Sequence, residues 1–574
     1  MSTVRGSDST KPTLLTPQAY LFIVAIGVAA CLPLYLYGLP LILDLNHHYR
    51  TALGFYESIV SGNYYPSWHP STNGGYGDLS VRFYPPALYY MLCAFKLITR
   101  DWFLASLLTV TSLAIAGALG MYLWARSFTS HYYALAASLL FVLAPFHANE
   151  LYQSGMYGQY AAASMLPFVF AFVERIIRGG RSSNVGLLGL SYGVLVLCNV
   201  PLAVLGSVSV AIYAVIRLVQ SFKLSVVYRL AAGAALGVAL SCFYWFPVMR
   251  ELKWKSPSGI DQGAWFDYRN NFLFHSSPSV MSDFLLPLLA LATITMAAPS
   301  IILLFKKDRR AVAPAVIAVL GFLMSTMVSK PIWDRLPILQ ETQFPWRWMT
   351  ITSASISLLT ALGLAEMYSM WRLRLRALSI AFTGLVLFAL SFTIFQLMRG
   401  AILSDRAEFN QKVEWLKGSK TNQDFLPVWA KGQVRRMNSE IEAPNRAVTV
   451  LEWSPERKIF SLEAGQATDV RLKTYYYPHW LASANATHLV TTPADDGALL
   501  VRVPSEKTTI ELKFTEPLSS YIAGSVSVVA LLMIVSLLVL EWWPNFVGAS
   551  LRGRPTSQMA RERIGRPRRD APTN

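Results

Sequence analysis

Residues 19–50 read AYLFIVAIGVAACLPLYLYGLPLILDLNHHYR, and they place a long apolar run directly before acid, imidazole and guanidinium side chains. An apolar helix of about 20 residues is long enough to cross roughly 30 Å of hydrocarbon. No small-residue cleavage site follows the run 19–43 closely, so we interpret it as a retained membrane span and not as a removed signal peptide. The stretch predicts a membrane protein whose polar chemistry begins where the first span ends.

The rest of the chain predicts a polytopic α-helical membrane protein. Hydrophobic residues make up 53% of its 574 positions and charged residues only 14%, a composition too apolar for an ordinary soluble enzyme. A short apolar segment, 86–99, mixes tyrosines and a lysine into its apolar face, and we expect it to lie in the membrane interface. We expect about twelve spans, near 19–43, 103–125, 131–146, 158–177, 184–200, 201–217, 230–247, 283–304, 311–329, 350–370, 377–397 and 518–541.

The distribution of charge sets the expected topology. The formal net charge is +17, but many of the basic residues gather in short links between spans and in the tail, which argues against a nucleic-acid partner. Under the positive-inside rule both termini are cytoplasmic, and the loops 44–102, 147–157, 248–282 and 330–349 face outward. The four cysteines have a spacing typical of neither a metal site nor a disulfide framework, so we expect them to serve packing.

The C-terminal part of the chain changes character. Residues 398–517 carry charges throughout and short alternating runs between turn residues, which predicts a small, mainly β, extracytoplasmic domain with a helical part near 405–417. The tail is rich in arginine and proline, and we expect it to be disordered near anionic lipid. The expected organisation is a cytoplasmic N-terminus (1–18), a transmembrane domain (19–397), the outer domain (398–517), a last span (518–541) and a basic cytoplasmic tail (542–574).

The residues after the first span form the first candidate site. Asp44 precedes a predicted amphipathic helix through about residue 60, with His47 and His48 one turn further on and Arg50 beyond them. One interpretation is that Asp44 only caps this helix. The other is that Asp44 is a general base that takes a proton from a hydroxyl, while the histidines orient substrate or phosphate. The two roles are compatible.

The segment 62–86 is dense in turn formers and aromatic rings, including Trp68, Tyr76 and Tyr84. Such rings are typical of an aromatic belt at a membrane interface. They are equally suited to stack against the flat apolar faces of sugars. Arg82 adds a cation beside these rings, and this combination suits a lipid phosphate.

Two further outer loops add candidate binding residues. The loop FHANELYQSGMYGQY at 146–160 contributes His147 and Glu150. The loop KPIWDRLPILQETQFPWRW at 330–348 contributes Lys330 and Arg347 at the membrane edge. These cations either extend their charged ends toward the interface or stabilise the anion that develops on a phosphate leaving group.

Several of these stretches resemble a known family. The position of Asp44, the run GNYYPSW at 62–68, GYG at 75–77 and YPPALYY at 84–90 look like the first outer loop of GT-C-fold glycosyltransferases that use polyprenyl-phosphate sugars. With FPWRW at 344–348 and YYYPHW at 475–480, the chain is similar to bacterial membrane proteins described as having a 6-pyruvoyl-tetrahydropterin-synthase-related domain. The similarity extends over most of the chain, and its specific motifs lie in 44–90 and 344–348.

The resemblance implies an inverting membrane glycosyltransferase in the bacterial inner membrane. In this interpretation Asp44 activates the acceptor hydroxyl, and loop cations bind the phosphate of a polyprenyl-linked donor. The acceptor is a lipid, a glycan or a protein on the outer face. The expected topology agrees with it, because nucleotide sugars are cytoplasmic and an outward-facing transferase needs a lipid-linked donor.

The chain departs from the family pattern at one point. Several GT-C members pair two acids in this loop, whereas Leu45 follows Asp44 here. A second carboxylate would have to come from Glu57, Asp78 or Glu150. A divalent metal is therefore doubtful, and we assign no metal ligand and no certain cofactor.

Two other classes of function stay open. A lipid-linked glycan transporter or flippase would use the many spans and the outer aromatic residues, but it would need polar residues across the membrane, and ionisable residues are nearly absent from the span centres. A non-catalytic envelope-glycan assembly protein would use the outer β domain to bind a partner. Phosphate-binding-loop, zinc-protease and nucleophile-elbow motifs are absent from the sequence.

Overall fold

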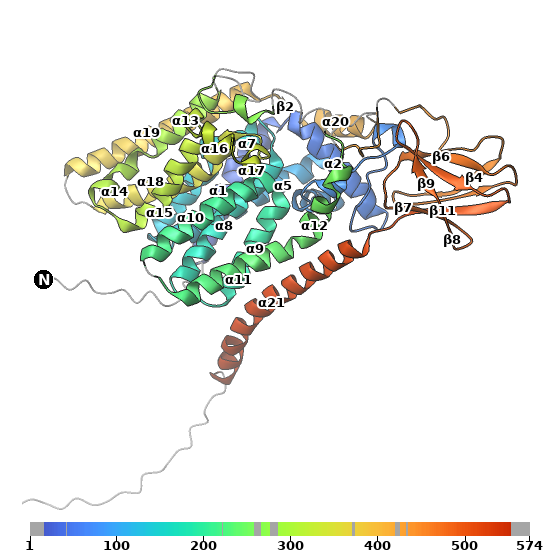
Figure 1. Ribbon diagram of the computed structural model, residues 1–574. Helices are drawn as coiled ribbons and strands as arrows, with labels where there is room; N and C mark the ends of the chain where they lie inside the picture. The colour runs from blue at the N-terminus through green and yellow to red at the C-terminus, as the bar shows by residue number, and fades with distance from the viewer. Residues whose placement is uncertain are drawn as a thin grey trace, which may run out of the picture.

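The computed structural model describes residues 16–41, 43–220, 222–257, 266–275, 285–369, 373–418, 425–431 and 434–552. Most of the expected N-terminal segment 1–18 lies outside these described residues, as does the tail beyond residue 552. The described chain forms a helical part joined to a β-rich part near its C-terminus (Figure 1).

Eight helical segments in the described residues are long and apolar enough to cross a membrane. They are Pro17–Tyr37 (α1), Trp102–Ala125 (α5), Tyr157–Ile177 (α8), Val200–Gln220 (α10), Leu285–Phe305 (α13, Leu285–Met296, with α14, Ile301–Phe305), Pro345–Ser369 (mainly α18, Trp348–Ser369), Arg376–Gly400 (within α19, Leu373–Gly400) and Leu518–Leu540 (within α21, Leu518–Arg552). The protein is thus an integral membrane protein with a helical membrane part.

Two bent helix pairs raise the number of candidate spans among the described residues to as many as ten. Helices α6 (His131–Val142) and α7 (Pro145–Tyr152) meet at 48°, with Pro145 at the first position of α7. Helix α11 (Leu224–Leu240) meets the segment Cys242–Trp254, which begins with α12 (Cys242–Glu251), at 65°.

The sequence led us to expect twelve spans, two more than the ten candidates, because two of the expected spans are short helices. Helices α9 (Ser183–Cys198) and α15 (Arg309–Met324) have 16 residues each. At about 1.5 Å of rise per residue, such a helix covers less than the roughly 30 Å of a hydrocarbon core. An apolar run in the sequence therefore marks a helix here without guaranteeing a full crossing.

The first span ends earlier than the expected run 19–43. Helix α1 stops at Tyr37, and Gly38 closes it at φ 105° with its N–H bonded to the Leu34 carbonyl. The next residues, Leu39–Pro40 (β1), pair antiparallel with Leu403–Ser404 (β2). A Cβ on Gly38 would lie 2.0 Å from the Ser404 carbonyl oxygen, so this pairing requires glycine.

The described residues between α1 and α5 form three α-helices, α2 (Leu43–Val60), α3 (Ser80–Phe83) and α4 (Ala87–Thr99). Helix α4 corresponds to the expected interfacial segment, and its residues Leu88, Tyr89 and Leu92 are buried. The remaining short helical elements are Asn73–Gly75, Leu252–Trp254, Tyr268–Asn270, Ala298–Ser300, Met327–Ser329, Lys330–Trp333 (α16), Pro337–Gln340 (α17) and Pro345–Arg347 (η6), and a longer helix, α20 (Arg406–Gly418), follows β2.

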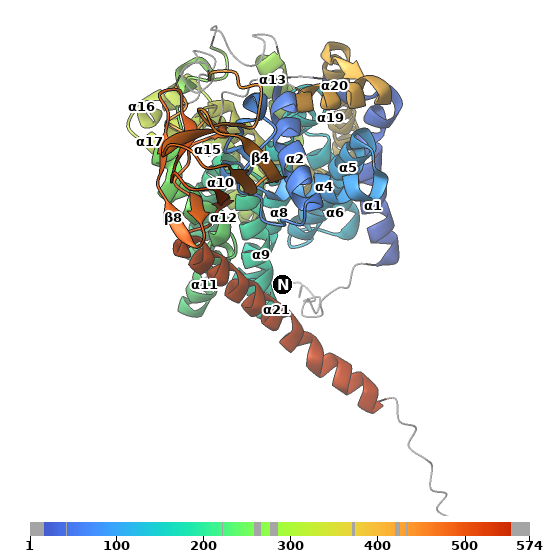
Figure 2. The ribbon, with the colours of Figure 1, turned by 90° about the vertical axis from the view of Figure 1, so that its right-hand side faces the viewer.

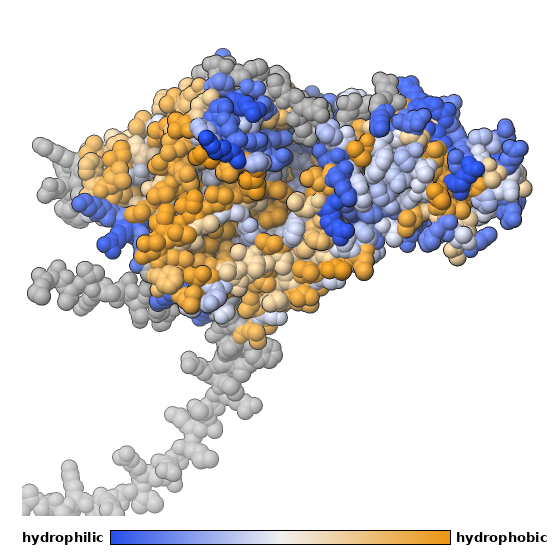
Figure 3. Space-filling model, viewed as in Figure 1, coloured by the Kyte–Doolittle hydropathy of each residue, from blue (hydrophilic) through white to orange (hydrophobic). Residues whose placement is uncertain are grey.

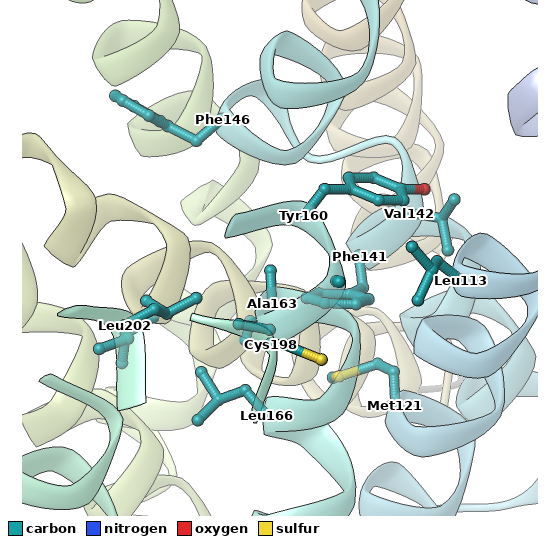
Figure 4. Packing of buried hydrophobic residues seen from close by; sticks show 14 of the residues in the cluster. Leu113, Met121, Phe141, Val142, Phe146, Tyr160, Ala163, Leu166, Cys198 and Leu202 are labelled. Carbon is teal, nitrogen blue, oxygen red and sulfur yellow. The ribbon is translucent and has the colours of Figure 1, made fainter. Parts of the chain in front are cut away.

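The interior of the helical part is packed around α5, α8 and α18. Trp124 of α5 stacks on Phe170 of α8 with ring centroids 4.6 Å apart. Figure 4 shows part of this packing, in which the side chains of Cys198 and Met121 point toward each other near the ring of Phe141. Helices α19 and α21 are mostly exposed in the isolated chain, and apolar surface covers much of the helical part in Figure 3. This pattern is that of a bundle with its outer helices facing lipid.

The β-rich C-terminal region expected from the sequence consists of two antiparallel sheets, and its strands lie in front of the helical part in Figure 2. Inward residues such as Leu472, Val501 and Ile510 come from both sheets and share one hydrophobic core. The four-stranded sheet has the order β3 (Ile441–Glu442), β6 (Thr468–Tyr475), β10 (Ala498–Val503) and β9 (Thr491–Pro493), and the five-stranded sheet β4 (Val448–Trp453), β5 (Arg457–Leu462), β11 (Thr508–Phe514), β7 (Trp480–Ala484) and β8 (Thr487–Leu489).

Candidate functional site

Asp44 lies in the first turn of α2, and its side chain is partly exposed. The N-terminal end of a helix stabilises negative charge, so this position favours a carboxylate. Burial raises the pKa of its carboxyl group above the usual range, while the charges of His47 and Arg347 act in the opposite direction. The His47 ring lies 5.1 Å from the ring of Tyr84. The structure therefore places these four candidate residues within one electrostatic neighbourhood.

His48 is buried beside these residues, with its ring 5.7 Å from that of Tyr84. It is 1% exposed, its Nδ1 atom lies 3.0 Å from the Tyr89 hydroxyl, and its ring is nearly parallel to that of Tyr157 at 6.3 Å. Burial, and secondarily the charge of His47, lower the pKa of His48 to about 3. His48 is thus a neutral side chain that fixes the position of α2.

Arg347 ends the short helix η6 and is 8% exposed. Its Nε donates to Gln159 Oε1 at 2.9 Å, and its Nη1 donates to the Thr342 carbonyl at 2.5 Å. The guanidinium also lies 4.6 Å from the centroid of the Phe344 ring. These contacts orient the cation rigidly, and its charge acts on Asp44 and Tyr84.

Glu150 on α7 continues this network away from Asp44. Its Oε1 accepts from Gln159 Nε2 at 2.6 Å and from Thr350 Oγ1 at 3.0 Å. Its Oε2 lies 3.5 Å from Nδ1 of His147, whose ring stacks on Tyr160 at 4.3 Å. Because Gln159 bonds both Glu150 and Arg347, a neutral amide separates the carboxylate from the guanidinium.

Arg82 is committed to two carboxylates. Its Nη2 donates to Glu251 Oε1 at 2.7 Å and to Glu516 Oε2 at 2.9 Å, and further bonds join the same partners. Glu251 also accepts from the Tyr477 hydroxyl at 2.6 Å and lies 3.0 Å from Nε2 of His479. Two anions already surround this cation, so its geometry favours a structural role over phosphate binding.

Trp68 and Tyr76 lie in the core of the β-rich part. Trp68 is 1% exposed and contacts the ring of Trp480 at 5.7 Å. Tyr76 is 2% exposed, and its hydroxyl donates to the Arg435 carbonyl at 2.7 Å. Neither ring is available to stack on a sugar in this arrangement.

Lys330 pairs with an acid away from the network around Asp44. Lys330 Nζ bonds Asp334 Oδ2 at 2.7 Å in a partly exposed pair. Arg50 follows on α2 and is partly exposed. The structure therefore brings together Asp44, His47, Tyr84, Glu150 and Arg347, with His48 and His147 packed beside them, and it separates Trp68, Tyr76, Arg82 and Lys330 from them.

The three candidates for a second carboxylate occupy different places. Glu57 Oε2 accepts from the Ser71 hydroxyl at 3.0 Å, and Asp78 is buried with its Oδ1 3.8 Å from His69 Nδ1. Glu150 alone of the three acts on Arg347. Among the described residues, no group of three or more His, Cys, Asp or Glu side chains is arranged to hold a metal ion.

Sequence reasoning missed Gln159, Thr350, Glu251 and Glu516. Gln159 lies in the quoted loop 146–160, where a polar residue at the start of a span was a usable signal. Thr350 lies in an apolar helix, and no local sequence pattern marks it as a site residue. Glu251 and Glu516 become partners of Arg82 only through long-range folding, because they follow it by 169 and 434 positions.

Comparison with solved structures finds similar chains. The arabinofuranosyltransferase AftD from Mycobacteria is 13% identical over 70% of this chain at a TM-score of 0.46, and the chain spans 29% of its length. An Archaeoglobus fulgidus oligosaccharyltransferase tethered to an acceptor peptide is 10% identical over 71% of this chain and 60% of its own, at 0.43. ArnT from Cupriavidus metallidurans, bound to undecaprenyl phosphate, is 14% identical over 71% and 77%, at 0.41.

Among curated proteins, none matches the chain. A protein family described as "6-pyruvoyl-tetrahydropterin synthase related domain; membrane protein" matches residues 81–395. The matched region begins at α3, ends within α19 and contains Glu150, Gln159 and Arg347. It covers more than half of the chain, and the chain therefore belongs to this family of membrane proteins.

Proposed function

We propose that the protein is a GT-C-like glycosyltransferase that moves a sugar from a polyprenyl-phosphate-linked donor to an extracytoplasmic lipid, glycan or protein. The observation that carries the proposal is the neighbourhood of Asp44, His47, Tyr84 and Arg347. A carboxylate with a raised pKa and a rigidly held guanidinium lie within electrostatic reach of each other there. These are the two charges that sugar transfer from a phosphate requires.

Asp44 is the proposed general base. As the acceptor hydroxyl oxygen bonds to the anomeric carbon, its proton passes to the Asp44 carboxylate, and the bond between that carbon and the phosphate oxygen breaks. A single displacement of this kind inverts the anomeric configuration. A raised carboxyl pKa favours the role, because proton transfer is most efficient when the pKa of the base approaches the working pH.

Arg347 is the proposed partner of the departing phosphate. The leaving group gains negative charge as the sugar departs, and a preorganised cation in a largely buried site stabilises that charge. His47 and Tyr84 extend the site beside Asp44, where they can contact the donor or the acceptor. Arg82, which two carboxylates neutralise, is not part of the proposal.

The proposed orientation follows from the charge distribution in the sequence. The site, the loops and residues 398–517 face outward, and both termini lie in the cytoplasm of a bacterium. The last span 518–541 then returns the chain to the cytoplasm. A site on the outer face is separated from nucleotide sugars, and this separation is the reason for proposing a lipid-linked donor.

The decisive variant is Asp44→Asn, which keeps the shape of the side chain and removes its basicity. In a host strain lacking the gene, the wild-type chain should restore the missing sugar of the envelope glycan, measured by compositional analysis. Asp44→Asn should restore none of it at equal membrane abundance. Asp495→Asn, the same change at an exposed position in the β-rich part, is the matched control and should restore it fully. Full restoration by Asp44→Asn would sink the assignment of the base.

A further inference from the structure

A groove of about 680 Å³ runs between α2 and α20 on the surface of the protein. We name it the α2–α20 groove. Its volume lies within the range of sites that hold small ligands. The residues that line it are Leu41, Asn46, Ile402, Glu408, Gln411, Lys412 and Trp415.

The groove presents a large aromatic ring. Trp415 is 58% exposed, and Lys412 Nζ lies 4.1 Å from the centroid of its ring. The opposite face of α20 is buried through Phe409, Val413 and Leu416. Trp415 therefore stands on the solvent side of an amphipathic helix and takes no part in the core.

Polar side chains with unused hydrogen-bonding capacity surround this ring. Within the part of the chain that the structure describes, the side chains of Asn46, Glu408 and Gln411 make no hydrogen bond. Two planar amides and a carboxylate offer donors and acceptors to a ligand rich in hydroxyl groups. Glu408 and Lys412 contribute one charge of each sign, so the lining matches an uncharged ligand better than a polyanion.

The walls of the groove are fixed in place. Arg406 Nε and Asn410 Nδ2 both donate to Asp101 Oδ2, at 2.9 and 3.0 Å. The ring of Phe409 packs edge-on against that of Tyr49 in α2 at 5.2 Å. A preformed site of this kind loses little conformational entropy on binding.

The groove also adjoins the proposed base. Leu41 precedes Asp44 in the chain and Asn46 follows it, so the groove opens at the end of α2 where Asp44 lies. We propose that the α2–α20 groove binds an uncharged oligosaccharide, the acceptor glycan of the transfer, with a sugar ring stacked on Trp415. The acceptor role rests on the proposed function, whereas the binding of an oligosaccharide does not.

The test measures binding without transfer. Full-length protein in lipid nanodiscs is labelled with 5-fluorotryptophan, and the ¹⁹F signal of position 415 is the one missing from Trp415→Phe. Maltotriose, cellotriose and xylotriose are then titrated separately to about 10 mM, beyond the millimolar limit of weak recognition. At least one should shift this signal in a saturable way. Gln411→Ala should weaken that response about fivefold, as expected for one lost hydrogen bond.

Glu414→Gln and Lys417→Ala are the matched controls, because both residues are exposed on α20 and neither lines the groove. Both variants should keep the response. Absence of a shift with all three sugars would overturn the proposal. Broadening of the Trp415 signal by a spin-labelled phospholipid, with no sugar response, would overturn it as well and assign the groove to the membrane surface.

Asp44→Asn separates this proposal from the proposed function. It should abolish transfer and keep the ¹⁹F response, because the groove binds without chemistry. If Asp44→Asn restores the envelope glycan and keeps the ¹⁹F response, Asp44 is refuted as the base and the oligosaccharide site is still supported. Loss of the sugar response in the wild-type chain, with transfer still dependent on Asp44, would refute the groove alone.

Discussion

At the scale of single residues, the most informative side chain is Gln159. It donates to Glu150 and accepts from Arg347, so it holds both charges in place without pairing them directly. In a direct ion pair, the Glu150 carboxylate would neutralise the positive charge of Arg347. The amide keeps that charge available to an anionic ligand, which is the property that the proposed phosphate site needs.

Gln159→Glu should weaken the binding of undecaprenyl phosphate about tenfold, a change of about 1.4 kcal/mol. The new carboxylate would neutralise Arg347 and repel Glu150. Native mass spectrometry of the full-length protein measures the affinity. Gln220→Glu is the matched control, because Gln220 Oε1 accepts from Arg217 Nη1 at 2.6 Å at an exposed position. Equal affinity of Gln159→Glu and the wild-type protein would contradict this role.

At the scale of elements, Arg82 joins three parts of the chain. It lies on α3, and its partners Glu251 and Glu516 lie at the end of α12 and just before α21. The paired carboxyl group of Glu516 has a lowered pKa, because hydrogen bonds and charge from Arg82 outweigh the effect of burial. The arginine thus ties the segment between α1 and α5 to the helical part and to the β-rich part.

Arg82→Ala should destabilise the protein by about 3–5 kcal/mol, because it leaves two largely buried carboxylates without their cation. The thermal unfolding midpoint of purified protein in nanodiscs measures the loss, and Arg82→Lys should recover part of it. Arg502→Ala, which removes a surface cation 3.3 Å from Asp469, should change the midpoint little. If Arg82→Ala keeps the thermal unfolding midpoint but loses the binding of undecaprenyl phosphate, Arg82 binds phosphate and is not structural.

Local sequence patterns predicted the secondary-structure elements better than the tertiary contacts between them. The apolar runs indicated the helices, and the expected helical part near 405–417 matches α20, because periodicity is a local property. The rings of Trp68 and Tyr76 lie in the core of the β-rich part, because partners such as Trp480 and Tyr475 come from far along the chain. Arg82 and Arg347 look alike in the sequence as candidate phosphate-binding cations. They differ in the structure because Arg82 pairs with Glu251 and Glu516, and these long-range contacts leave no local sequence pattern.

At the scale of the whole molecule, the β-rich part meets the segment between α1 and α5 through titratable groups. The backbone N–H of Ser67 donates to Glu456 Oε1 at 2.8 Å, and its hydroxyl donates to Glu516 Oε1 at 2.6 Å. Burial raises the pKa of Glu456 to about 7, with a smaller contribution from the charge of Glu516, while Ser67, Asn63 and Arg82 act in the opposite direction. The junction therefore contains a carboxyl group that titrates near neutral pH.

The stability of this junction should fall as the pH rises from about 4.5 to about 7. In that window the folded chain holds the Glu456 proton and the unfolded chain has lost it, so raising the pH favours unfolding. Glu456→Gln should remove this part of the pH dependence below pH 7. Thermal scans of both proteins across the window measure the difference. Parallel pH profiles would show that Glu456 does not titrate there.

Buried Lys458 acts on the neighbouring pH range and must be separated from Glu456. Burial lowers its pKa to about 7, and the charge of Glu456 opposes the shift. Between about 7 and 10.5 the unfolded chain binds the proton that the folded chain lacks, so this group makes stability rise with pH there. The comparison for Glu456 is therefore made below pH 7, where the two effects do not overlap.

The small ladder between Leu39–Pro40 and Leu403–Ser404 has a consequence for biosynthesis. A ribosome makes the first strand early and the second only after most of the membrane helices. This pairing, which lies just before α2 and Asp44, cannot form until translation has passed Ser404. Under the proposed function, a nascent chain would have no transferase activity during membrane insertion and would acquire it only after Leu39–Pro40 pairs with Leu403–Ser404.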